Sequence, residues 1–290
     1  MGENQQTKAP LLRCAQRWAT RQRAHLHQIF YSMRHAHRAI RQLMAAEEQP
    51  LSVHAMSVAR SQVESLYAIC LIVERPSALE DYLRDGWKKL FIRYITTREE
   101  CRALPRVADA LSKQWELFEK LRDASGVTKL EAETIEADEL GRALPAGVKP
   151  VKIAQFPTPK GVISNINDPN RKQMLMRLYP EYEFLCGFVH LSPVTEIMMS
   201  LLDDRQPFRR SFTSGQVTEI YQKEIVGPAI WLDLISVLQS CSEFTAIYSA
   251  DIELARACSE GWKPISGNTF IGRIIWELRT KQLLGVIGRV

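Results

Sequence analysis

Helix-start signals recur along this chain and limit the folds that it can adopt. Three boxes of the Ser/Thr-x-x-Glu type, whose two side chains cap backbone N–H groups reciprocally, stand at Ser77/Glu80, Thr97/Glu100 and Thr128/Glu131. Two further starts join a capping side chain to a proline in the first turn, at Asp168-Pro169 and Ser192-Pro193. Alternating strand patterns are nearly absent by comparison. The chain is therefore predicted to be all-α.

The spacing of apolar residues indicates where the helices extend. We expect helices over residues 11–46, 51–74, 78–96, 98–124, 129–143, 180–190, 193–203, 215–259 and 269–285, with an interruption at Gly227-Pro228. Four prolines forbid continuous helix between residues 144 and 168. Within that segment, Val151–Phe156 is long enough for one short strand. A segment of this length is either a linker between domains or a crossover within one.

We favour one bundle-like assembly over residues 1–290, because the segments after residue 168 are too apolar to remain without partners. Its parts are a basic amphipathic helix at 1–48, a first helical half at 49–143, a proline-rich crossover loop at 144–168 and a second helical half at 169–290.

The cysteines and the apolar stretches bear on location. The six cysteines lie far apart without a Cys-x-x-Cys pair, and the N-terminus shows no apolar run behind its basic residues, so a reducing cytoplasm is expected. The most apolar stretches, 184–202 and 227–250, contain Glu196, Asp233 and Glu243. Such residues are costly in a membrane, so we expect buried helices and no membrane association.

The first predicted helix is strongly basic. No acidic residue lies between Glu3 and Glu47, whereas the same segment holds Lys8, Arg13, Arg17, Arg21, Arg23, Arg34, Arg38 and Arg41. One interpretation is a surface that binds RNA or another polyanion, with Arg34, Arg38 and Arg41 along one face. Another is a solvated face whose arginines pair with the acidic segment 131–139, and a third is an acidic protein partner or a membrane surface.

A second polar set is predicted from spacing. Arg60 and Glu64 are four residues apart and share a helix face that continues through Tyr67 to Leu71, and we expect this face to be largely buried. Tyr182, Cys186 and His190 share a face in the same way. Because a buried charge needs a partner, the two segments are expected to meet in space.

The residues of this polar set form a pattern that resembles a protein family. The pattern Arg60-x-x-x-Glu64, followed by Tyr182-x-x-Leu185-x-x-x-Val189-His190-x-Ser192, resembles an uncharacterised bacterial family of helical proteins, over roughly residues 50 to 205. That family is similar in style to the HEPN domains, many of which are RNA-cleaving toxins or phage-defence proteins.

HEPN ribonucleases place a histidine four to six residues after an arginine, at a dimer interface. Arg21 and His27 have that spacing, although the position after the arginine holds Gln22; Arg177 lies too far before His190. The resemblance implies catalysis by Arg60, Glu64 and His190 or by Arg21 and His27, with histidine as acid or base and arginine stabilising phosphate charge. From the residues alone, Arg60, Glu64 and His190 fit a structural network equally.

Two function classes remain open. One is a nucleic-acid-associated protein with a HEPN-like RNA-cleaving or phage-defence role; the other is a non-enzymatic helical interaction or scaffold protein.

No glycine-rich phosphate loop, nucleophile elbow or dinucleotide fingerprint is present, and the His-x-His pairs point to different sides of a helix. We therefore expect neither cofactor nor metal. The predicted helix 269–285 either forms a homodimer interface or docks within the monomer.

Overall fold

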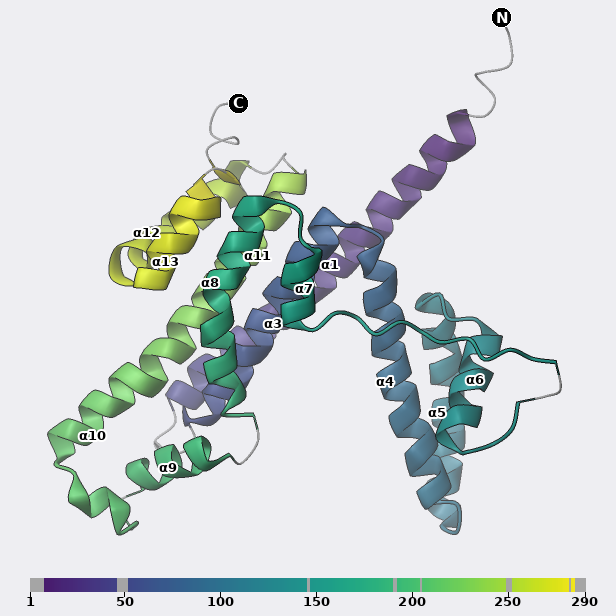
Figure 1. Ribbon diagram of the computed structural model, residues 1–290, viewed down its shortest axis with the longest axis horizontal. Helices are drawn as coiled ribbons and strands as arrows, with labels where there is room; N and C mark the ends of the chain where they lie inside the picture. The colour runs from purple at the N-terminus through teal and green to yellow at the C-terminus, as the bar shows by residue number, and fades with distance from the viewer. Residues whose placement is uncertain are drawn as a thin grey trace, which may run out of the picture. The chain divides into compact units, whose positions relative to one another are not determined.

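The computed structural model describes residues 8–45, 52–144, 147–189, 192–203, 205–248, 252–281 and 283–284. Every regular element in these ranges is a helix (Figure 1), which confirms the all-α multi-helix architecture. The strand considered at 151–156 is absent, because those residues have no regular secondary structure. Helix α7 (Pro159–Asn165) begins inside the predicted proline-rich loop.

The chain folds into two compact units. The larger unit comprises Met1–Glu74 and Pro159–Val290, and the smaller unit comprises Arg75–Thr158. Helix α3 (His54–Glu74), assigned by its sequence to the first helical half, thus belongs to the same unit as the helices after residue 159.

The larger unit is built around α3. Its other elements are α1 (Lys8–Met44), α7, α8 (Pro169–Cys186), α9 (Pro193–Leu202), η1 (Phe208–Ser211), α10 (Ser214–Ile220), η2 (Tyr221–Val226), α11 (Gly227–Tyr248), α12 (Ile252–Asn268), α13 (Phe270–Ile275) and η3 (Trp276–Thr280). Helix α3 contacts α1, α8 and α11. It is apolar on most sides, and residues from Leu66 to Ile72 are all buried. A helix with this pattern belongs in the centre of a core.

Three of the helix starts form as their sequences predict. Thr128 and Glu131 make the reciprocal capping box at the start of α6 (Lys129–Glu139). The Asp168 carboxylate accepts from the backbone N–H of Arg171 at 2.7 Å, and the Ser192 hydroxyl caps α9. These signals are local, so they form independently of distant residues.

Three other predictions of helix boundaries are wrong, and the first is the start near residue 180, since α8 begins at Pro169. Helix α4 (Ala78–Glu100) runs through Thr97, and the buried residues Tyr94 and Ile95 hold it in the core less than one turn before the expected start. No break occurs at Gly227-Pro228 either. Figure 1 shows α10, η2 and α11 as one continuous helix. Here η2 is a π-helical segment, and its wider turn just before Pro228 accommodates the proline ring.

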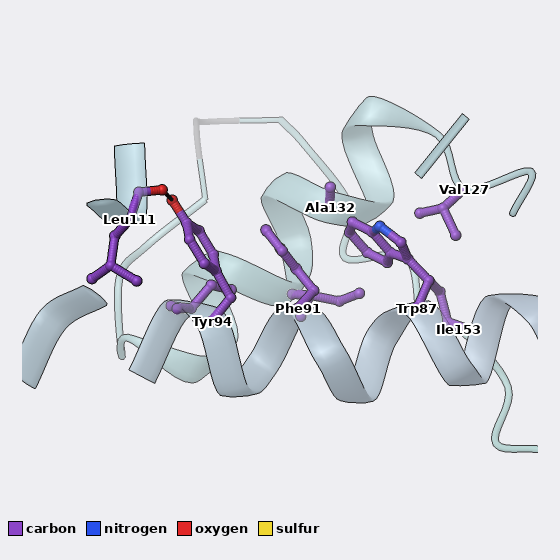
Figure 2. Close-up of a cluster of buried hydrophobic side chains, with 9 residues drawn as sticks. Trp87, Phe91, Tyr94, Leu111, Val127, Ala132 and Ile153 are labelled. Carbon is purple, nitrogen blue, oxygen red and sulfur yellow. Dashed lines mark hydrogen bonds between the residues drawn. The ribbon is translucent and has the colours of Figure 1, made fainter. Parts of the chain in front are cut away.

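The smaller unit packs α5 (Pro105–Ala124) and α6 against α4. Figure 2 shows Trp87, Phe91 and Tyr94 in a row along α4, with Ala132 of α6 near them. The Tyr94 hydroxyl donates to the backbone carbonyl of Leu111 at 3.1 Å, and the Trp87 indole donates to that of Phe118 at 3.2 Å. Trp87 and Tyr94 thus each combine apolar packing with a satisfied polar group.

Candidate functional site

Helix α1 has one apolar face and one cationic face. Leu26, Met33 and Ile40 are each 1% exposed, and they face the core at helical spacing. Arg34, Arg38 and Arg41 are exposed on the other side at three- and four-residue steps. We call these three residues the arginine stripe. Burial of the apolar face fixes which side of α1 the stripe occupies.

The acidic segment 131–139 was the alternative partner of these arginines, and two of its carboxylates form ion pairs with other residues. Glu131 pairs with Arg84, and Glu136 pairs with Arg98 at 2.5 Å, all within the smaller unit. Within the described part of the larger unit, no carboxylate lies in ion-pair distance of the arginine stripe. The arginine stripe is thus exposed and has no carboxylate partner in the described part of its own unit.

A buried carboxylate holds α1 in place. Asp233 of α11 is 1% exposed, and its Oδ2 lies 2.5 Å from Nδ1 of His37. Gln62 of α3 donates from Nε2 to Asp233 Oδ1 at 2.6 Å and to the carbonyl of Met33 at 2.8 Å. Burial raises the pKa of Asp233, and the contacts with His37 and Gln62 partly offset this effect. The three helices therefore meet at one polar point.

The predicted meeting of α3 with α8 is confirmed for four residues. Arg60 Nη2 donates to the Tyr182 hydroxyl at 3.1 Å, and its Nε donates to Cys186 Sγ at 3.3 Å. The Tyr182 hydroxyl donates to Glu64 at 3.0 Å, and Glu64 also pairs with Arg60 at 2.8 Å. His190 lies outside the described residues, as does the side chain of Arg21.

The burial expected for the face of Arg60 and Glu64, which continues through Tyr67 to Leu71, is confirmed for Tyr67 and Leu71 but is wrong for the two charged residues. The side chains of Arg60 and Glu64 are 24% and 37% exposed, so both stand at the edge of the α3–α8 contact. Burial would lower the pKa of Arg60, but bonds to Cys186 and Tyr182 and the charge of Glu64 outweigh it and raise that pKa. Burial, with bonds to Cys186 and Glu64, raises the pKa of Tyr182. A fixed guanidinium and a protonated phenol form a polar tie between two helices.

A second buried network was missed by sequence reasoning. Glu243 of α11 is fully buried and accepts from Arg171 at 2.8 Å and from Arg279 at 2.8 and 3.0 Å. Arg171 also pairs with Glu74 at 2.7 Å, and Arg279 pairs with Asp168 at 3.0 Å. The network joins α3, α8, α11 and η3.

A signal for this network exists in the sequence. Asp233, Ser236, Ser240 and Glu243 lie at three- and four-residue steps on a largely apolar helix, and all four are buried. Such a stripe indicates internal polar contacts on a core helix. Sequence reasoning used Asp233 and Glu243 only as arguments against a membrane span.

Two structural observations concern metal binding and membrane crossing. In the described residues, no group of three or more His, Cys, Asp or Glu side chains could hold a metal ion. The stretches His54–Glu74 and Ser214–Phe244 are long and apolar enough to cross a membrane by length and composition. More than half of each apolar window is buried inside the protein, as in ordinary core helices.

Comparison of this chain with protein-family models, with curated proteins and with solved structures gives no match.

Proposed function

We propose that this protein associates with nucleic acid through the arginine stripe on α1, and that RNA is its preferred ligand. The observation that carries the proposal is the exposure of Arg34, Arg38 and Arg41 on one face, without a carboxylate partner in the described part of their unit. Arginines that stabilise the fold of this protein are instead paired with carboxylates. Arg171 and Arg279, for example, each pair with two carboxylates.

The geometry of the stripe suits a phosphate backbone. Arg34 and Arg41 are separated by two helical turns, or about 10 Å along the axis. Guanidinium groups bind phosphate through paired N–H donors, and each neutralised phosphate releases condensed counterions. The resemblance of the Arg60 to Ser192 pattern to HEPN-like proteins supports RNA over DNA, and extends the proposal to an RNA-cleaving or phage-defence role.

A specific observation favours the alternative, a non-enzymatic helical interaction protein. Arg60 has Nε and Nη2 engaged by Cys186 and Tyr182, and its charge is balanced by Glu64. That set supports the structural interpretation of Arg60 and Glu64 over the catalytic one. Any acid–base chemistry is therefore better sought on α1.

A charge-matched pair of variants tests the binding proposal. The first replaces Arg34, Arg38 and Arg41 by Gln. The control replaces three arginines that are exposed on other elements of the same unit, Arg177, Arg205 and Arg210, by Gln. Both variants lose three positive charges, so they differ only in where the charge is lost.

Binding to single-stranded RNA and DNA oligonucleotides of the same sequence is measured at low salt by fluorescence anisotropy. The stripe variant should bind RNA at least tenfold more weakly than the wild type, since phosphate contacts supply most of the affinity of such surfaces. The control should stay close to the wild type, and circular dichroism should show both folded. Equal losses in the two variants, or a wild type that ignores RNA, would refute the proposal. Tighter binding of DNA would correct the ligand class.

A further inference from the structure

His37 of α1 contacts a buried carboxylate, whereas His27 and His35 of the same helix pack against aromatic rings. The side chain of His37 is 31% exposed, and its Nδ1 contacts the buried carboxylate of Asp233 at 2.5 Å. His27 instead packs edge-on against the ring of Phe244, and His35 against that of Tyr31. No ion pair with a carboxylate is found for either ring within the described residues.

We propose that His37, oriented by Asp233, is the general base of an RNA-cleaving site on α1. The inference rests on the proposed association of the arginine stripe with RNA. It names the general base of that site. The sequence had instead suggested His27, together with Arg21, or His190 for this role.

The contact with Asp233 determines which nitrogen of His37 can act. A carboxylate at Nδ1 holds the proton on that nitrogen, which leaves the lone pair on Nε2. Gln62 donates to the other carboxylate oxygen at 2.6 Å, so the carboxylate cannot rotate freely. The side chain of His37 is 31% exposed, whereas that of Asp233 is 1% exposed, so the imidazole extends from the buried carboxylate toward the surface of α1. In the described residues, no other polar partner of His37 is found.

The arginine stripe and His37 share one stretch of α1. Arg34 precedes His37 by three residues and Arg41 follows it by four, so they flank it one turn before and one turn after. Both arginines are exposed, and both can hold a phosphate against the same side of α1. A base and two cations thus share one short stretch of helix.

RNA supplies the remaining reactant, because its 2′-hydroxyl is the nucleophile. His37 Nε2 accepts the 2′-hydroxyl proton while O2′ forms a bond to the adjacent phosphorus. The bond from phosphorus to O5′ breaks, and O5′ takes a proton from water. The resulting hydroxide neutralises the imidazolium proton, so the products are a 2′,3′-cyclic phosphate and a 5′-hydroxyl end. Arg34 and Arg41 stabilise the charge that develops on the phosphate oxygens.

Three single variants of the full chain test the assignment. His37→Gln removes the base but retains a hydrogen-bond donor for Asp233. Asp233→Asn keeps the shape of the positioning residue and removes its charge. His35→Gln is the matched control, because His35 lies on the same helix and is exposed without a carboxylate partner in the described residues. Each variant is first checked for helix content and thermal unfolding.

Cleavage of a single-stranded RNA oligonucleotide, and of one carrying 2′-deoxyribose throughout, is followed by gel with analysis of the product ends. The wild type should cleave only the RNA and leave cyclic phosphate ends. His37→Gln should bind RNA normally but cleave it at least 10²-fold more slowly, the usual contribution of a general base. His35→Gln should cleave like the wild type. Asp233→Asn should lower kcat while its KM for RNA stays at the wild-type value, because Asp233 orients His37 and does not contact RNA; a merely structural role would change both.

The outcomes separate this inference from the binding proposal. A wild type that binds RNA through the stripe and leaves it intact overturns the inference while binding stands. A wild type that does not bind RNA overturns both. Cleavage that survives in His37→Gln and disappears in His27→Gln assigns the chemistry to the other histidine and overturns the role of His37. Cleavage of the deoxyribose strand overturns the 2′-hydroxyl mechanism.

Discussion

Replacing Glu243 by Gln should weaken the larger unit strongly. The Glu243 carboxylate is fully buried and accepts four hydrogen bonds. Its Oε2 receives one N–H from Arg171 at 2.8 Å and one from Arg279 at 3.0 Å. In the amide, one side of the group becomes an N–H donor that faces these two guanidinium groups. The substitution therefore removes two charge-assisted bonds while the rest of the side chain keeps its shape.

The expected loss follows from these contacts. A hydrogen bond to a charged group contributes about 1.5–3 kcal/mol, and removal of one partner from a buried ion pair costs about 3–5 kcal/mol. Arg171 and Arg279 retain Glu74 and Asp168, so the loss should lie near 3 kcal/mol rather than above 5 kcal/mol. In urea, with a slope of about 3 kcal/mol per molar, the unfolding midpoint should fall by about 1 M.

Urea unfolding followed by circular dichroism measures this loss. Glu277→Gln is the control, because Glu277 makes an exposed pair with Lys281 at 3.3 Å, and such pairs contribute little. Its midpoint should match that of the wild type. If Glu243→Gln also unfolds at the wild-type midpoint, the buried network does not stabilise the unit and the reasoning is wrong.

Three further predictions follow from other contacts. Gly272→Ala should cost about 1–3 kcal/mol, since a Cβ there would lie 2.8 Å from a backbone carbonyl oxygen, whereas Gly267→Ala meets nothing within 4 Å; thermal unfolding compares them. Thr128→Ala should cost about 1 kcal/mol through loss of its cap, and Ser77→Ala, whose hydroxyl makes no cap bond, should cost less by the same measurement. Burial opposes ionisation of Glu243, but Arg279 and Arg171 outweigh it and lower the pKa of Glu243. Its contribution should therefore be present above its unfolded pKa of about 4.3 and be lost as pH falls through the lowered value, and Glu243→Gln should flatten that acid limb in unfolding curves recorded at successive pH values.

Local signals in the sequence predicted much of the fold. The caps at Thr128, Asp168 and Ser192 depend on residues within one turn, so their patterns sufficed. The box at Thr97 failed because the burial of Phe91 and other aromatic residues of α4 outweighs a capping preference. Local preference decides a boundary only where packing does not.

Long-range partners were predictable only where an unpaired charge limited the options. The meeting of Arg60 with Tyr182 was expected because both segments needed polar partners. The contact of His37 with Asp233 joins residues 196 apart in the chain, and no local pattern links them. The arginine stripe was predictable only in part. Its spacing is visible in the sequence, but its exposure depends on which face of α1 packs in the core.

The salt dependence of RNA binding tests the central claim, which is that the arginine stripe binds a phosphate backbone. Affinities of the wild type and of the triple variant of Arg34, Arg38 and Arg41 are measured at a series of salt concentrations, and log K is plotted against log salt. Each phosphate contact to a single strand contributes a slope of about 0.7, so loss of three contacts should reduce the slope by about 2. Two parallel lines would mean that the stripe contacts no phosphate, and would contradict the account.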